Sequence, residues 1–281
     1  MSREISKDRW LIGLEKEKEY NRKREDIEER LIERREVWAR LLDSLKCEVS
    51  FDNSKRILDV GAEATSIFLA LREGEKYAVD PLFAYLFELH PFLKEIEEYK
   101  DVNFISSPFQ DMTSDKSFDI IFILAMLEHL GTLKPVVGKV DELLAPSSTL
   151  VVLVDCLSDP VVRNIVSFFD IYPYHPHHFV PDDITKLFSN YRLTKQEQIS
   201  EIYRDCPSKE RKIIRIYRID KVIAKIWELS GVWARGRRIQ FALRLILCYS
   251  LIFVIVLLRR KGKPIWPPLN YKPWLFVFQK P

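Results

Sequence analysis

The sequence is poor in the residues that build fibrous or cross-linked proteins. Glycine is scarce, with 8 among 281 residues, and the 15 prolines are ordinary for this length, which excludes collagen-like and low-complexity chains. The four cysteines, Cys47, Cys156, Cys206 and Cys248, lie far apart and form no CxxC pair. Neither a disulfide framework nor a cysteine-based zinc site is expected, so a reducing compartment is the default.

An apolar run near residue 1 is also missing, so no signal peptide is expected. Hydrophobic residues make up 47% of the chain and charged residues 30%, which is enough to bury a core. A chain of 281 residues can form one large domain or a domain with a sizeable insertion.

The net charge of +3 is too small to indicate nucleic-acid binding over the whole surface, so no nucleic-acid partner is expected. The charge is distributed unevenly, however. Residues 209–263 contain 15 Lys or Arg and 3 Asp or Glu, a local charge of +12 that leaves −9 for the rest of the chain.

One long apolar run, residues 241–258, lies inside this basic window, with Arg244 as its single internal charge. As a helix it would be about 27 Å long, slightly shorter than the hydrocarbon core of a bilayer. Basic residues and Trp227, Trp233 and Trp266 flank it. This pattern predicts that residues 239–260 contact a membrane from its cytoplasmic side. A buried core helix or an oligomer interface is the alternative.

The remaining chain divides by pattern into a helical extension and an α/β region. Residues 1–50 hold 13 basic and 13 acidic residues, with apolar residues at helical spacing, and predict an N-terminal helical extension. From 51 to 200, short apolar runs alternate with helical segments, which is typical of a doubly wound α/β core. Strands are expected at 56–60, 76–80, 102–106, 118–124, 149–155 and 192–199, and helices at 66–72, 84–99, 133–144 and 182–190.

Residues 274–280 again have the composition of a strand. If residues 271–281 return to the sheet as its final strand, residues 201–270 form a basic and apolar insertion before that strand. Such an insertion cannot cross a membrane once; it must dip in and return, or lie along the interface. The predicted fold is therefore a mostly parallel seven-stranded sheet with N-terminal helices and an apolar helical insertion.

The first two predicted strands carry an acidic residue at their carboxyl ends. Asp59 is the penultimate residue of the first strand, two positions before Gly61, and Asp80 ends the second. In an open α/β sheet, ligands bind at the carboxyl ends of strands where the strand order reverses. Gly61 permits a sharp turn there, and Thr65 or Ser66 can cap a following helix whose amides attract an anion. Asp80 is placed to accept hydrogen bonds from a ribose diol.

The ordered series ILDVG, AVD, SFDIIFILAMLEHL and TLVVLVD resembles the class I methyltransferases that use S-adenosylmethionine. The resemblance covers roughly residues 50–200. It implies a Rossmann-like fold and S-adenosylmethionine as cofactor. The family's first strand ends in hhDhGxGxG, which Asp59 and Gly61 match, and its acid after the second strand corresponds to Asp80. The stretch beginning at Leu124 would face the methionine part of the cofactor.

The resemblance also contains departures. The family's later loop glycines correspond to Glu63 and Thr65. The loop is expected to contact cofactor through Gly61, Ala62 and Glu63, and this requires either a Glu63 carboxylate turned away from that of the methionine part or a reshaped loop. The family's acid near the adenine falls at residues 108–110. Here Gln110 would replace it as a hydrogen-bond partner and Phe109 would stack on the base.

No catalytic pair stands out. Three of the five histidines lie in HPHHF (175–179), where His175 or His178 is expected to touch the acceptor or act as a base, and no metal site is expected. His129 is expected to be structural, capping the turn after the fourth strand. Glu128 and Asp155 are possible bases, although methyl transfer needs mainly alignment of nucleophile and sulfonium.

These features predict an S-adenosylmethionine-dependent methyltransferase that acts at or near a membrane. Its acceptor would be a small molecule or a lipid, such as an isoprenoid or a lipid-linked sugar. The alternative is a non-catalytic, membrane-tethered scaffold with the same fold, which Glu63 and Thr65 favour. A third possibility is a soluble oligomer whose apolar helices pair with each other. The sequence leaves the oligomeric state open.

Overall fold

The computed structural model describes residues 5–24, 26–158, 176–203 and 271–281, together with Pro160, Arg163, Asn164 and Ser167. The predicted membrane-contacting stretch 239–260, the rest of the 201–270 insertion beyond residue 203, and His175 lie outside the described residues. In the part of the chain that is described, no helix is both long enough and apolar enough to span a bilayer.

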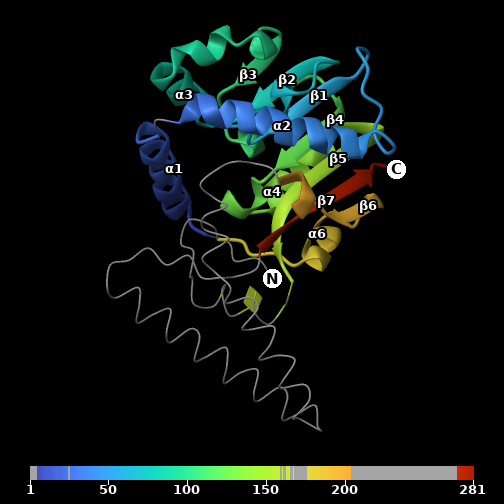
Figure 1. Ribbon diagram of the computed structural model, residues 1–281. Helices are drawn as coiled ribbons and strands as arrows, with labels where there is room; N and C mark the ends of the chain where they lie inside the picture. Colours follow the sequence, from blue (N-terminus) through green and yellow to red (C-terminus); the bar gives the residue numbers. More distant parts are fainter. Residues whose placement is uncertain are drawn as a thin grey trace. The chain divides into compact units, whose positions relative to one another are not determined.

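A seven-stranded sheet, with strand order β3-β2-β1-β4-β5-β7-β6, forms the centre of the fold (Figure 1). The pairs β3–β2, β2–β1, β1–β4 and β4–β5 are parallel, whereas β6 and β7 pair antiparallel. This confirms the predicted mostly parallel seven-stranded sheet and the return of the last segment to it, whereas the predicted apolar insertion falls outside the described residues. The strands are β1 (Arg56–Val60), β2 (Glu75–Val79), β3 (Val102–Ile105), β4 (Phe118–Leu124), β5 (Leu144–Leu157), β6 (Arg192–Gln198) and β7 (Tyr271–Gln279).

Both faces of the sheet are covered, because side chains alternate along each strand and both sets are apolar. Phe122 and Leu124 of β4 belong to one core, and Ile121 and Ile123 belong to the other. The first core includes residues of α2 (Ile27–Leu45) and α3 (Phe83–Leu89). The second includes residues of α4 (Lys134–Leu143) and α6 (Pro181–Leu187).

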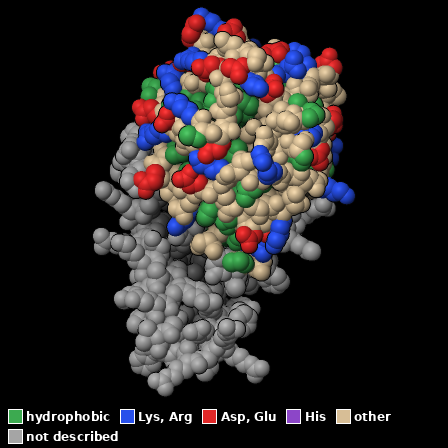
Figure 2. All heavy atoms as spheres, turned by 90° about the vertical axis from the view of Figure 1, so that its right-hand side faces the viewer, with side chains coloured by type: hydrophobic (Ala, Val, Ile, Leu, Met, Phe, Trp, Pro, Cys, Tyr) green, Lys and Arg blue, Asp and Glu red, His purple; other side chains and the backbone are tan. Residues whose placement is uncertain are grey.

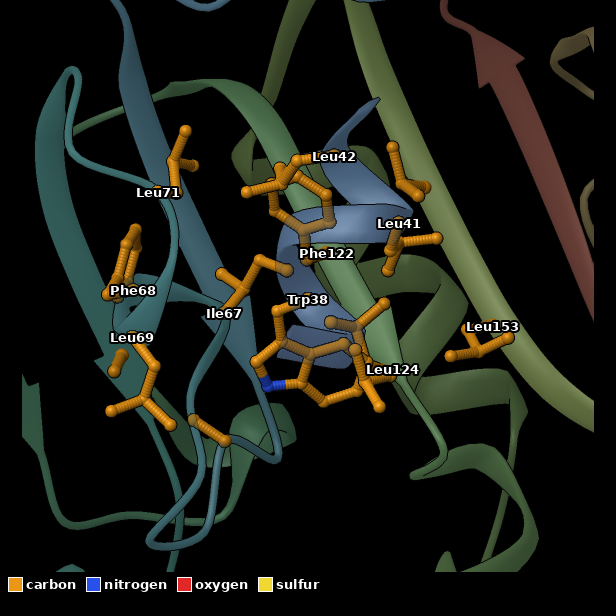
Figure 3. Close-up of a cluster of buried hydrophobic side chains, with 14 of the residues drawn as sticks. Trp38, Leu41, Leu42, Ile67, Phe68, Leu69, Leu71, Phe122, Leu124 and Leu153 are labelled. Atoms are coloured by element: carbon orange, nitrogen blue, oxygen red, sulfur yellow. The ribbon is translucent and has the colours of Figure 1, made fainter. Parts of the chain in front are cut away.

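Helix α2 belongs to the N-terminal extension, yet it lies across the centre of one sheet face (Figure 1). Its apolar residues recur at helical spacing and are nearly inaccessible, with Leu41 and Leu45 fully buried. Figure 3 shows Trp38, Leu41 and Leu42 of α2 among Ile67 of the β1–β2 connection and Phe122 of β4. The extension is therefore part of the core rather than an appendage.

Two predicted helices are wrong in extent. The expected helix 66–72 is a single 3-10 turn, η1 (Ile67–Leu69), because the chain must reach β2 at Glu75 through Gly74. Gly74 has φ +89°, and a Cβ there would lie 2.8 Å from the Lys55 carbonyl oxygen. The expected helix 84–99 breaks into α3, η2 (Pro91–Glu95) and η3 (Glu97–Tyr99), since Pro91 forces His90 out of helical backbone geometry.

The remaining long helix, α1 (Lys7–Arg22), is only weakly buried. Asn21 is its one buried residue, while Leu11, Ile12 and Tyr20 are exposed. Ser6 caps it by accepting a hydrogen bond from the Arg9 amide. A short connection leads from α1 into α2.

Candidate functional site

A cavity lies at the carboxyl ends of β1 to β4, where the strand order reverses. Each of the four loops that follow these strands contributes to its wall, and α1 forms a further side. The loop residues are Gly61, Glu63, Val79, Asp80, Pro81, Leu82, Pro108, Phe109, Gln110, Ala125, Met126, His129 and Leu130, and the residues from the N-terminal segment are Ile5, Arg9, Trp10, Gly13, Leu14 and Glu17.

Gly61 turns the chain at the end of β1 with φ +72°, a conformation that favours glycine. Its amide donates to the Val79 carbonyl oxygen (2.8 Å), which joins the loop to β2. A Cβ at this position would lie 2.4 Å from Cγ of Met126, in the loop after β4. The loops after β1 and β4 therefore approach so closely that only glycine fits.

Asp59 does not line the cavity, although it directly precedes the turn. Its Oδ2 accepts hydrogen bonds from the Ser66 hydroxyl (2.6 Å) and the Ile67 amide (2.9 Å). Burial raises the pKa of Asp59 to about 6, against the effect of these two donors. The Asp59 carboxylate thus anchors the end of the loop, at Ser66 and Ile67, to β1. Ala62 and Leu124 are also buried outside the cavity lining.

Asp80 lies in the cavity wall at the end of β2 and connects two loops. Its Oδ1 accepts the Leu82 amide (2.7 Å), and its Oδ2 accepts the Glu63 amide (3.0 Å). The side chain is buried, and this burial, together with the nearby Glu63 and Asp59 charges, raises the pKa of Asp80 to about 7. Each oxygen retains a second lone pair, so the carboxylate can accept further hydrogen bonds from a ligand.

Glu63 occupies a left-handed backbone conformation, φ +49°, where the family pattern has glycine. Its carboxylate pairs with the guanidinium of Arg30 on α2, Oε1 to Nη1 at 3.2 Å and Oε2 to Nη2 at 2.7 Å. Both side chains are about four-fifths buried, with 22% and 19% exposed. A glycine at this position would carry no charge. The negative charge of Glu63 is balanced by Arg30, which lies 33 residues earlier in the sequence.

Phe109 and Gln110 line the cavity from the loop after β3. They lie in the 3-10 turn η4 (Phe109–Asp111) after β3, with Pro108 at its start. The Phe109 ring is nearly inaccessible to solvent. The predicted pair of an aromatic face and an amide thus lines the same cavity as Asp80 and Gly61.

Sequence reasoning missed the contribution of α1. Trp10, Gly13, Leu14 and Glu17 lie at spacings of three, four and seven residues, so they share one face of the helix, and this face lines the cavity. This spacing was visible in the sequence, but nothing local showed which loops the face would meet. Two hydrogen bonds to the backbone of this segment fix it: the Ile5 amide donates to the Gly131 carbonyl oxygen (3.1 Å), and the Tyr85 hydroxyl donates to the Lys18 carbonyl oxygen (3.0 Å).

The histidines lie in two places. His129 lines the cavity, and its amide donates to the Met126 carbonyl oxygen (3.0 Å) in the turn after β4. His177 and His178 are buried beside the end of β5, outside the cavity lining. Burial lowers the pKa of His177 to about 4, so its ring is neutral at pH 7. The described residues contain no group of three or more His, Cys, Asp or Glu placed to hold a metal ion.

The two candidate bases differ in environment. Glu128 is buried, and burial together with the nearby Asp155 charge raises its pKa to about 8, so it is mostly protonated at pH 7. Asp155, at the carboxyl end of β5, is exposed. Neither side chain lines the cavity.

No protein-family model and no curated protein sequence matches this chain. Solved structures do. YcgJ from Bacillus subtilis is 16% identical with a TM-score of 0.51, over 87% of this chain and 97% of YcgJ. Geranyl diphosphate C-methyltransferase from Streptomyces coelicolor, solved with S-adenosyl-L-homocysteine, is 10% identical with a TM-score of 0.52, over 86% of this chain and 76% of that enzyme.

The cyclase SpnF is 13% identical with a TM-score of 0.53, over 86% of this chain and 80% of SpnF. The chain therefore has the fold of the class I S-adenosylmethionine-dependent methyltransferases. Because one of these neighbours is named as a cyclase, the fold by itself does not define the reaction.

Proposed function

We propose that this protein is an S-adenosylmethionine-dependent methyltransferase. The observation that carries the proposal is the cavity at the carboxyl ends of β1 to β4, which brings together Gly61, Asp80, Phe109 and Gln110 from three separate stretches of sequence. These residues follow three different strands, yet they supply the groups needed along one extended nucleoside ligand. Residues that matched the family pattern by chance alone would not all line the same cavity.

The side chains fit this cofactor at both ends. The Asp80 carboxylate retains lone pairs for a ribose diol, Gln110 offers an amide to an adenine edge, and the nearly buried Phe109 side chain contributes an apolar part of the wall beside it. At the other end Arg30 neutralises Glu63, which reduces repulsion of a ligand carboxylate. When bound, the cofactor supplies a methyl group on a sulfonium. The protein would then orient an acceptor nucleophile against it and exclude water.

Calorimetric titration with S-adenosylhomocysteine tests the proposal, with NADH as the control ligand. We expect S-adenosylhomocysteine to bind wild-type protein and Asp80→Ala to weaken that binding strongly. Asp101→Ala is the matched control. Asp101 is an exposed acid that directly precedes β3, and it does not line the cavity. Well-folded wild-type protein that binds no S-adenosylhomocysteine would overturn the proposal.

We further propose that the protein works at the cytoplasmic side of a membrane on a small-molecule or lipid acceptor. The support is the apolar stretch with its basic flanks, residues 239–260, which the sequence carries outside the described residues. The geranyl diphosphate enzyme, named for an isoprenoid substrate, gives a precedent on the same fold. A nucleic-acid partner is not proposed, since acidic and basic side chains intermix on the face drawn in Figure 2.

Flotation with vesicles containing anionic lipid tests this second part. Wild-type protein should float with the vesicles, and Ile252→Lys/Ile255→Lys should remain at the bottom of the gradient because two charges interrupt the apolar run. Wild-type protein that stays soluble and unbound with vesicles would contradict membrane action and leave the cofactor proposal untouched.

The competing function is a non-catalytic scaffold with the same fold. The observation that favours it is that both Asp80 oxygens already accept backbone amides, those of Glu63 and Leu82. The titration above separates the two functions, because a scaffold would bind neither S-adenosylhomocysteine nor S-adenosylmethionine.

A further inference from the structure

Glu17 is the carboxylate that the N-terminal helix α1 adds to the cavity. It lies on the same helix face as Trp10, Gly13 and Leu14, all of which line the cavity. Its Oε1 is 3.9 Å from Nδ1 of His129, in the loop after β4. Glu17 therefore lies beside the loop after β4, and the Glu63 charge of the loop after β1 acts on its carboxylate.

The other carboxylates of the cavity wall are already engaged. Glu63 makes two hydrogen bonds with Arg30, and Asp80 accepts two backbone amides. Among the described residues, the ion pair recorded for Glu17 is the long one with His129. Burial lowers the pKa of His129, so this ring is a weak cationic partner at pH 7. Glu17 thus has hydrogen-bonding capacity left for a ligand.

The electrostatics of the site agree with this geometry. Burial, followed by the neighbouring Glu63 charge, raises the pKa of Glu17, while Arg24 acts in the opposite direction. A cation placed between Glu17 and the loop after β1 would relieve that repulsion and lower the pKa again. A positively charged ligand group beside Glu17 would therefore be attracted by this carboxylate, whereas Arg9 is the cationic residue in the cavity lining and Arg30 is paired with Glu63.

We propose that Glu17 binds the ammonium group of the cofactor's amino-acid part, so that α1 supplies a specificity-determining residue to the cofactor site. The inference rests on the proposed function, because it takes S-adenosylmethionine as the ligand. It assigns to the N-terminal helix a role that the family's strand-end motifs do not describe. A charged hydrogen bond of this kind typically changes affinity by roughly ten- to a hundredfold.

Calorimetry with three ligands tests the inference. S-adenosylmethionine and S-adenosylhomocysteine both carry the ammonium group, whereas 5′-methylthioadenosine keeps the nucleoside and sulfur but lacks the amino acid. Glu17→Gln should weaken the first two by a similar factor, roughly tenfold or more, and leave 5′-methylthioadenosine unchanged. Glu15→Gln is the matched control, because Glu15 lies on α1 with a 68% exposed side chain and pairs with the Lys18 ammonium.

Three outcomes would overturn the inference. Unchanged binding of S-adenosylhomocysteine to Glu17→Gln shows that the carboxylate does not contact the amino-acid part. Equal weakening of 5′-methylthioadenosine shows that Glu17 only supports α1. Weakening of S-adenosylmethionine alone shows that it faces the sulfonium instead. If wild-type protein binds none of the three ligands, the proposed function itself fails, which is a distinct result.

Discussion

Arg30 of α2 and Glu63 of the loop after β1 form a two-point ion pair, with nitrogen–oxygen distances of 3.2 and 2.7 Å. Further along the same helix, the Trp38 indole nitrogen donates to the Thr65 carbonyl oxygen at 2.7 Å. Two side chains of the N-terminal extension thus hold the loop that replaces the family's glycine-rich turn. The loop depends on α2 for its shape as well as for its charge balance.

Removing Arg30 should therefore impair the cofactor site. Arg30→Met leaves the largely buried Glu63 carboxylate without its cation, and we expect about 1–3 kcal/mol of lost stability together with weaker S-adenosylhomocysteine binding. Glu63→Gly in the same chain should restore most of the binding, because glycine carries no charge and adopts φ +49° without strain. Urea unfolding and calorimetry measure the two effects. Equal binding by Arg30→Met and wild-type protein would contradict the role given to the pair.

Gly61 should tolerate no side chain while Met126 is present. Gly61→Ala places a Cβ 2.4 Å from Met126 Cγ, so we expect loss of stability and of ligand binding. Met126→Ala in the same chain should recover part of the stability but not all of it, because alanine at φ +72° costs roughly 1 kcal/mol. Thermal unfolding of the four proteins of this cycle measures the coupling. Strictly additive effects would show that the two residues do not collide.

Cofactor binding should strengthen as the pH rises through 7. The pKa of Asp80 is raised to about 7, so much of the protein carries a protonated Asp80 at pH 6, and ribose hydroxyls donate best to the ionised form. S-adenosylhomocysteine affinity should rise by up to about tenfold per pH unit below 7 and level off above pH 8. Asp80→Asn, which has no such proton, is the control and should show a flatter profile. Parallel profiles for the two proteins would exclude Asp80 as the titrating group.

Glu128 should make the protein less stable at alkaline pH. Its pKa is raised from 4.5 to about 8 by burial and the Asp155 charge. The folded state therefore keeps a proton that the unfolded state releases. The stability linked to Glu128 is complete below pH 4.5 and is lost as the pH rises through 8. Glu128→Gln should gain stability over wild type between pH 5 and pH 9, on the order of 3 kcal/mol.

Urea unfolding at both pH values measures that difference, and Glu142→Gln provides an exposed acid as the control. If the difference in unfolding free energy between wild-type protein and Glu128→Gln is the same at pH 5 and pH 9, Glu128 is ionised in the folded protein at every pH tested.

The central strands were predictable because both of their faces are buried, whereas the edge strand β6 is largely exposed. A strand such as β4, FDIIFIL, must then be apolar at nearly every position, and that run is visible without any partner. The helices between β1 and β3 were predicted less well. The short path from β1 to β2 and the proline at position 91 determine their form more than helical propensity does.

The candidate site divides in the same way. Gly61, Glu63, Asp80, Phe109 and Gln110 were proposed from their places after strands, and the structure puts all five around one cavity. Asp59, Ala62 and Leu124 were proposed on the same basis and lie outside it. Alternation along the strand explains Asp59, since its side chain points to the face covered by α2 and bonds to Ser66 and Ile67.

By itself, the sequence determined the α/β class, the return of the last segment to the sheet and the acidic strand ends, because burial and turn geometry act on neighbouring residues. Only the tertiary structure decided that Arg30 meets Glu63 and that α1 brings Glu17 to the cavity. These contacts join residues far apart in the chain. Their energy depends on distances that the packing of α1 and α2 sets, and no local pattern records those distances.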